Sequence, residues 1–134
     1  MPSRVAIVLA VVLVAAGCGV RNSNPFTAKS TAPCLVKKGF TGVTTKLTEV
    51  GFIAGFADHG GLKATSPAGN TVTIAFTASP DAVASTEQAF RTHAPPAVRP
   101  HIADIMSANR NAVLVWTTTP SAADLDTANR CLEP

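Results

Sequence analysis

The chain has 134 residues, of which 46% are hydrophobic and 14% are charged, and its formal net charge is +3. This excess of positive charge is too small for a nucleic-acid-binding protein, and the basic residues are scattered apart from the pair Lys37 and Lys38. The length suits one domain that buries a hydrophobic core without the help of a metal ion.

The first residues have the pattern of an export signal. Arg4 gives the start of the chain a positive charge, and an uninterrupted apolar run follows from Val5 to Ala16. A helix over this run would span roughly 18 Å, at about 1.5 Å per residue. Because the hydrocarbon core of a bilayer is ~30 Å thick, the run predicts a signal peptide and not a permanent transmembrane anchor.

Cys18 closes this leader in the sequence "AAGC". The stretch resembles the lipobox of bacterial lipoproteins, although Ala15 stands where that family usually has leucine or a similar branched residue. The resemblance covers residues 1–19 only. It implies that the Cys18 thiol receives a diacylglyceryl group, whose two acyl chains anchor a protein stably, and that residues 1–17 are removed. The alternative is an ordinary signal peptide whose Cys18 carries no lipid.

The residues after Cys18 divide into a tether and a domain. Residues 19–33 are rich in Gly, Asn, Ser, Thr and Pro and show little periodicity, which is typical of an extended or disordered linker. We therefore predict a lipidated cysteine and flexible tether over residues 18–29 and a single α+β domain over residues 30–134.

Cys34 and Cys131 lie near the two ends of this domain. An even number of cysteines in an exported protein favours a disulfide bond, and we predict that these two are paired. The sequence has no C-x-x-C and no histidine pair beside them, so a metal site at the cysteines is not expected. Two buried free thiols are the alternative.

The domain is predicted to begin with a helix and a strand. Ser30 or Thr31 suits the start of a helix that Gly39 ends. Residues 41–50 alternate between apolar and polar side chains, which indicates a half-buried strand.

A hairpin is predicted next. The segment 51–61 is interrupted by glycines and shows no regular pattern, but three apolar residues in it need cover: Phe52, Ile53 and Phe56. The runs 62–66 and 71–77 then flank a turn that contains Gly69 and Asn70.

The second half is predicted to contain helices around one strand. Ser79 and Pro80 are typical of a helix start, and Pro95 and Pro96 end that helix. The remaining predicted elements are a helical stretch over 97–108, a strand over 111–119 and a helix over 120–132. In this last helix Ser121 and Asp124 have capping-box spacing, with Asp in place of the usual Glu.

This order of elements predicts an α+β fold. We expect a two-layer sandwich in which a mostly antiparallel sheet of three or four strands packs against helices. The bond between Cys34 and Cys131 would join the N-terminal helix to the C-terminal helix.

The most enzyme-like stretch is "DHGG", from Asp58 to Gly61. Esterases of the α/β-hydrolase type use an H-G-G loop, but they also need G-x-S-x-G, which this sequence lacks. His93 and His101 flank a proline-rich turn, and no carboxylate joins them at metal-ligand spacing. We therefore expect a loop and exposed histidines here, with no catalytic residue, no metal and no cofactor.

Trp116 lies on a predicted strand whose two faces are both apolar. Val113 and Val115 face one side, and Leu114 and Trp116 face the other. Such a strand is either covered on both sides or has an open face for a partner. If Trp116 is exposed, it forms with Leu114 the candidate surface for a protein or a small ligand.

Together these features predict a lipid-anchored exported bacterial lipoprotein, with a small binding or scaffolding domain at the outer face of the cytoplasmic membrane. One alternative is a small cell-envelope hydrolase or metal-dependent enzyme that uses Asp58 and His59. Another is a secreted soluble binding protein in which Cys18 is never acylated. The ligand or protein partner is not evident from the sequence, and a nucleic-acid partner is not expected.

Overall fold

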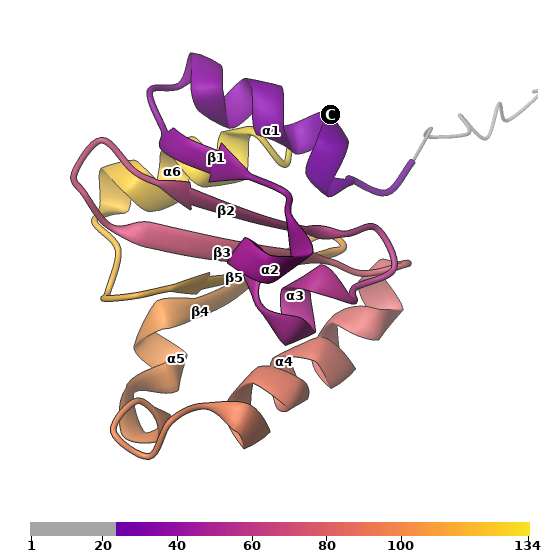
Figure 1. The fold of residues 1–134 in the computed structure, drawn as a ribbon, viewed down its shortest axis with the longest axis vertical. Helices are drawn as coiled ribbons and strands as arrows, with labels where there is room; N and C mark the ends of the chain where they lie inside the picture. Colours follow the sequence, from indigo (N-terminus) through magenta and orange to yellow (C-terminus); the bar gives the residue numbers. More distant parts are fainter. Residues whose placement is uncertain (1–23) are drawn as a thin grey trace, which may run out of the picture.

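The computed structural model of the protein describes residues 24–134, and Figure 1 shows its fold. The elements in chain order are α1 (Ala28–Lys37), β1 (Thr41–Thr44), α2 (Leu47–Val50), α3 (Phe52–Gly55), β2 (Gly61–Thr65), β3 (Thr71–Phe76), η1 (Pro80–Ala82), α4 (Val83–His93), η2 (Arg99–His101), α5 (Ile102–Ile105), β4 (Met106–Asn109), β5 (Ala112–Trp116) and α6 (Ala122–Arg130). Within these described residues, every helix is too short or too polar to span a bilayer.

The strands form one antiparallel sheet in the order β1-β2-β3-β5-β4. The expected α+β class is confirmed, and the sheet has five strands where three or four were expected. The additional strand is β4, at one edge. At the other edge, β1 pairs with β2 through a register shift between Thr41 and Thr44, where Gly42 has a φ of +59°.

Helices lie on both sides of this sheet. In Figure 1, α1 and α6 lie together above the strands, and α4 and α5 lie below them. Val72, Ile74 and Phe76 of β3 are completely buried in the main core, which α1 and α6 share. Ala75 points to the opposite face and packs in a smaller cluster with residues of α2, α3 and α4. Ile102 and Ile105 of α5 belong to the main core, so α2, α3 and α4 are the helices that cover the opposite face and add to the expected sandwich of one sheet and one helical layer.

The folded part begins earlier than the predicted boundary at residue 30. The Asn111 side chain accepts a hydrogen bond from the Phe26 backbone N–H at 2.9 Å and donates one to the Phe26 carbonyl at 2.8 Å. Thr27, and not Ser30 or Thr31, caps α1 in a capping box with Ser30. The Thr27–Ser30 capping box is a local signal for the start of the helix, whereas the hydrogen bonds between Asn111 and Phe26 join residues 85 positions apart and have no local signature.

The predicted strand over residues 41–50 is shorter than expected. It ends at Thr44, whose hydroxyl accepts a hydrogen bond from the Lys46 backbone N–H at 3.2 Å. This turn leads into α2, a single helical turn that buries Val50. The alternating pattern therefore predicted β1 correctly. The same alternation extends over the residues of α2, which is too short to show a helical period.

The hairpin of β2 and β3 is confirmed. The two strands pair from Gly61 with Ala75 to Thr65 with Thr71. Gly69 lies in the turn with a φ of +87°, a conformation that glycine adopts without steric cost.

The region predicted as one helical stretch over 97–108 divides into two structures. Only η2 and α5 are helical, and the chain then becomes β4, which pairs with β5 from Met106 with Val115 to Asn109 with Ala112. Ile102 and Ile105 are both buried, so their spacing correctly predicted a helix. The predicted helix was extended too far, over the residues of the short strand that follows.

The caps of α4 and α6 are only partly as expected. Ser79 and Pro80 do begin a helical segment, but that first turn is a 3₁₀ turn and the Ser79 side chain makes no capping bond. Ser121 caps α6 by accepting a hydrogen bond from the Asp124 backbone N–H at 3.1 Å. The Asp124 carboxylate does not complete a capping box, since it accepts a hydrogen bond from the Ser66 hydroxyl at 2.6 Å.

The predicted disulfide is present between Cys34 in α1 and Cys131 just after α6. The two Cα atoms are 5.6 Å apart, and the residues are separated by 97 positions in the sequence. The bond therefore joins the first and last helices of the described domain, as the sequence predicted.

Candidate binding surface

Two of the predicted site residues, Leu114 and Trp116, do not form a surface. Leu114 is 0% exposed and Trp116 is 2% exposed. They pair in register with Ile74 and Val72 of β3 and share the core beneath α1 and α6. A partner surface was expected here only if Trp116 were exposed, and that condition is not met; the more open face of the strand is the other one, which carries Val115.

Cys18, the predicted lipidation site, lies outside the described residues. The described domain begins close to it in sequence, at Asn24.

The "DHGG" stretch forms a structural junction between three segments. The His59 backbone N–H donates to the carbonyl of Phe76 at 2.9 Å, and the His59 carbonyl accepts from the Ala28 N–H at 3.0 Å. A side chain at Gly61 would lie 2.5 Å from the carbonyl oxygen of Ala54, so only glycine fits between β2 and α3. The close approach of Ala54 accounts for the glycine at position 61, whereas the contacts of His59 are made by its backbone and the Asp58 side chain is exposed.

The two other histidines lie apart from a metal-binding arrangement. His101 is exposed, and its Nδ1 lies 4.0 Å from the Asp104 carboxylate one helical turn away. His93 is exposed at the end of α4. Among residues 24–134, no three histidine, cysteine or carboxylate side chains gather closely enough to hold a metal ion.

A groove lies between α3 and α4 over the open face of the sheet. It consists of two neighbouring hollows of about 330 Å³ and about 280 Å³ that share Phe52, Ile53 and His93. The floor of the first hollow includes Thr73 and Val115, on the face of the sheet opposite to the main core. The remaining lining of the first hollow is Val50, Gly51, Ala54 and Phe90, and that of the second is Phe56, Ala57, Asp58, Ser85, Thr86 and Ala89.

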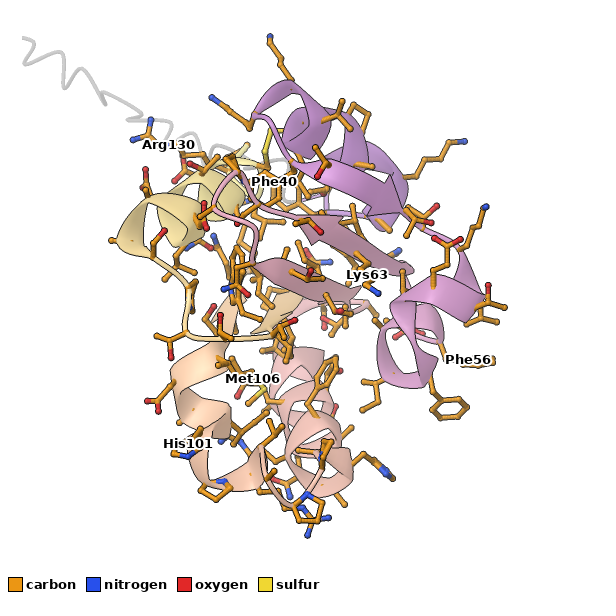
Figure 2. All side chains as sticks on the ribbon, turned by 60° about the vertical axis from the view of Figure 1, so that its left-hand side comes forward. Phe40, Phe56, Lys63, His101, Met106 and Arg130 are labelled. Carbon is orange, nitrogen blue, oxygen red and sulfur yellow. A yellow bond between two sulfur atoms is a disulfide. The ribbon has the colours of Figure 1, made fainter. Side chains whose placement is uncertain are left out.

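Three large apolar side chains project beside this groove, and we name them the apolar tip: Leu47, Phe52 and Phe56. Phe52 is 78% exposed, Phe56 is 66% exposed and Leu47 is 46% exposed. The two phenylalanine rings contact each other with centroids 4.9 Å apart, as expected for residues four apart on a helical turn. Figure 2 shows Phe56 pointing away from the body of the domain.

The sharp bend between α2 and α3 produces this exposure. Gly51 separates the two helical turns with a φ of +85°, a conformation that favours glycine. Gly55 has no side chain, and a Cβ there would lie 2.1 Å from a methyl carbon of Leu47. The two short helices therefore pack closely where Leu47 lies against Gly55, while Phe52 and Phe56 project into solvent.

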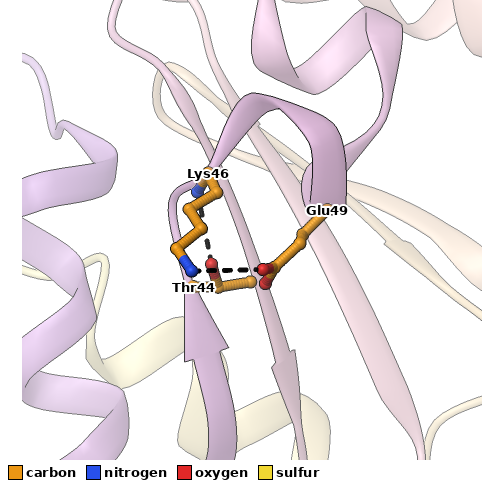
Figure 3. Close-up of polar contacts among 3 residues, drawn as sticks. All are labelled: Thr44, Lys46 and Glu49. Carbon is orange, nitrogen blue, oxygen red and sulfur yellow. Dashed lines mark hydrogen bonds and ion pairs between the residues drawn. The ribbon is translucent and has the colours of Figure 1, made fainter.

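A small polar group lies at the base of the apolar tip (Figure 3). The Lys46 ammonium lies 3.5 Å from the Glu49 carboxylate. The Thr44 hydroxyl lowers the pKa of Glu49, and the nearby charge of Lys46 lowers it further. Both side chains are exposed to solvent, so the pair forms a solvated rim beside the apolar tip.

Sequence reasoning noted that Phe52 and Phe56 need cover, but it did not predict that they would project into solvent. The available signal was the position of Gly51 and Gly55, which interrupt the apolar segment and shorten its helices. His93 was expected to be an exposed histidine, and it is exposed; the sequence did not indicate that it lies on the wall of an apolar groove.

Comparisons with protein-family models, with curated proteins and with solved structures returned no significant match.

Proposed function

We propose that this chain is an exported bacterial lipoprotein, anchored through Cys18 at the outer face of the cytoplasmic membrane, whose domain has a binding role. The observation that carries the proposal is the disulfide between Cys34 and Cys131. Structural disulfides form and persist in oxidising compartments, outside the cytosol. The pairing also leaves Cys18 as the remaining cysteine of the sequence, directly after the apolar leader.

The character of the groove supports binding over catalysis. Its walls are mainly aliphatic and aromatic, with His93 the titratable group common to both hollows. Apolar lining with few polar groups is typical of sites that hold an apolar surface or ligand.

Metabolic labelling tests the lipid anchor. Cells that express the full chain are given an alkyne analogue of palmitate, and the isolated protein is examined for label. We expect the native chain to carry label and Cys18→Ser to lose it. The matched control is the double variant Cys34→Ser/Cys131→Ser, which removes the disulfide and should keep the label.

A second measurement separates the lipoprotein from a secreted soluble protein. A globomycin-type inhibitor of the lipoprotein peptidase should cause the native chain to accumulate as a precursor that retains residues 1–17. An unlabelled protein that is processed normally in the presence of the inhibitor would contradict the proposal.

A further inference from the structure

We propose that the apolar tip, Leu47, Phe52 and Phe56, inserts into the surface of the membrane that carries the anchor. The proposed partner of this side of the domain, where the groove lies beside the apolar tip, is a lipid surface. This inference rests on the proposed anchor at Cys18 and adds an orientation to it: the α2–α3 side of the domain faces the bilayer, and α1 and α6 face away.

The exposure of the apolar tip indicates that it is an interaction site. A single exposed apolar side chain is ordinary on a soluble protein, but adjacent large apolar side chains rimmed by polar groups mark an interaction site. Phe52 and Phe56 together present two rings in contact, each more than half exposed. Phenylalanine and leucine are typical of apolar faces that lie in the boundary between lipid headgroups and acyl chains.

The start of the domain places the proposed anchor within reach of the apolar tip. The Ala28 N–H donates to the carbonyl of His59, and His59 follows Phe56 by three residues. The chain thus leaves the domain beside the loop that follows α3. Residues 18–25 can extend over at most about 28 Å, which is enough for the lipid on Cys18 and the two phenylalanine rings to reach the same bilayer surface.

The charges near the apolar tip indicate that the contact is apolar. Lys46 is paired with Glu49 at 3.5 Å, and Arg91 on α4 lies 4.0 Å from Glu87. Lys63 is exposed on the neighbouring strand, and Figure 2 shows it close to the α2–α3 side. Because positive and negative side chains are nearly balanced, membrane contact should depend little on salt or on the fraction of anionic lipid.

Fluorescence quenching by brominated lipids tests this orientation. The lipoprotein is isolated from membranes, its acyl group is verified by mass, and it is reconstituted in vesicles of phosphatidylethanolamine and phosphatidylglycerol with brominated acyl chains. The variant Phe52→Trp places an indole in the apolar tip. Val36→Trp is the matched control, since Val36 is 58% exposed on α1, on the other side of the sheet. The native chain supplies the background from Trp116.

We expect the added emission of F52W to fall at least about twofold in brominated vesicles, while that of V36W is nearly unchanged, because quenching requires contact with the acyl chains. Phe56→Trp should repeat the result if F52W is poorly folded. Equal quenching of F52W and V36W, or quenching of neither, would overturn the inference.

Other outcomes are equally decisive. If the lipidated protein sediments as a dimer that F52W dissociates, the apolar tip is an interface between copies and the inference is wrong. If the isolated protein carries no acyl group, the proposed anchor fails. Quenching that is absent from a protein with a verified acyl group contradicts the membrane contact alone.

Discussion

Asn111 joins three segments that are far apart in the sequence. Its side chain exchanges two hydrogen bonds with the Phe26 backbone and donates a third to the Thr77 carbonyl at 2.8 Å. The backbone carbonyl of Asn111 accepts hydrogen bonds from the backbone N–H and the hydroxyl of Thr77. The residue is 1% exposed, and Arg110 beside it turns the chain with a φ of +54°. One buried amide therefore holds both the start of the domain and the end of β3.

Replacing Asn111 by alanine tests this role. Asn111→Ala removes one acceptor and two donors. It leaves partly buried backbone groups of Phe26 and the buried carbonyl of Thr77 without these partners, at a cost of about 2–3 kcal/mol in the free energy of unfolding. Urea denaturation measures the loss, and chymotrypsin should cleave after Phe26 more readily. Asn109→Ala is the control, because its amide donates only to the Asn129 side chain at 3.2 Å. An equal loss in both variants would contradict the assigned role.

At the scale of elements, boundaries that depend on neighbouring residues were predictable from the sequence, and features that depend on contacts between distant residues were not. Ser121 caps α6 through a contact three residues away, and Gly39 ends α1 with a φ of +91°. The capping box of Thr27 and Ser30 at the start of α1 is a local signal, whereas the contact of Asn111 with Phe26, 85 residues away, has no local pattern. The strand β4 has only four residues and follows two buried isoleucines at helical spacing.

The candidate binding surface was harder to predict than the fold. Hydropathy favours burial of Phe52 and Phe56, and only the packing of α2 against α3 prevents it. The apolar residues on the strand face that carries Trp116 are compatible with a buried face and equally with an open one. The burial of Trp116 depends on the register in which β5 pairs with β3. Apolar character predicts that a residue needs cover, whereas tertiary packing decides whether the cover comes from the same chain.

The contact between Ser66 and Asp124 attaches the β2–β3 hairpin to α6. Both residues are buried, and the Ser66 hydroxyl also accepts a hydrogen bond from the Asn70 backbone N–H at 3.1 Å. Asp124 lies in the first turn of α6, where the helix dipole favours a carboxylate.

Removing the hydroxyl should weaken this attachment. Ser66→Ala leaves the buried Asp124 carboxylate without its donor and should reduce the free energy of unfolding by about 2 kcal/mol. A double-mutant cycle with Asp124→Ala should give a coupling of about 1–3 kcal/mol. Ser85→Ala on the exposed surface of α4 is the control and should change little. Strictly additive effects of the two substitutions would show that the contact does not stabilise the fold.

At the scale of the whole molecule, the disulfide closes almost the entire domain into one loop. Cys34 and Cys131 are 97 positions apart. Closing a loop of this length restricts the unfolded chain, and the chain-entropy model gives a stabilisation of at most about 4–5 kcal/mol.

Reduction tests that contribution. The double variant Cys34→Ser/Cys131→Ser, or the native chain in dithiothreitol, should unfold at a lower urea concentration, with a loss of about 2–4 kcal/mol. Mass spectrometry should show a gain of two hydrogens on reduction of the native chain. Cys18→Ser leaves the paired cysteines intact and should retain the native stability and the same gain. A native chain that takes up no hydrogens would contradict the bond.

The two edge strands of the sheet affect whether copies of the proposed membrane-anchored protein aggregate. Both edge strands, β1 and β4, have only four residues, and β1 is irregular where its register shifts between Thr41 and Thr44. Short or irregular edges offer few backbone groups to a neighbouring sheet and so oppose aggregation. Copies of a protein anchored as proposed would meet often in the bilayer, and edges of this kind would keep such encounters from growing into a continuous intermolecular sheet.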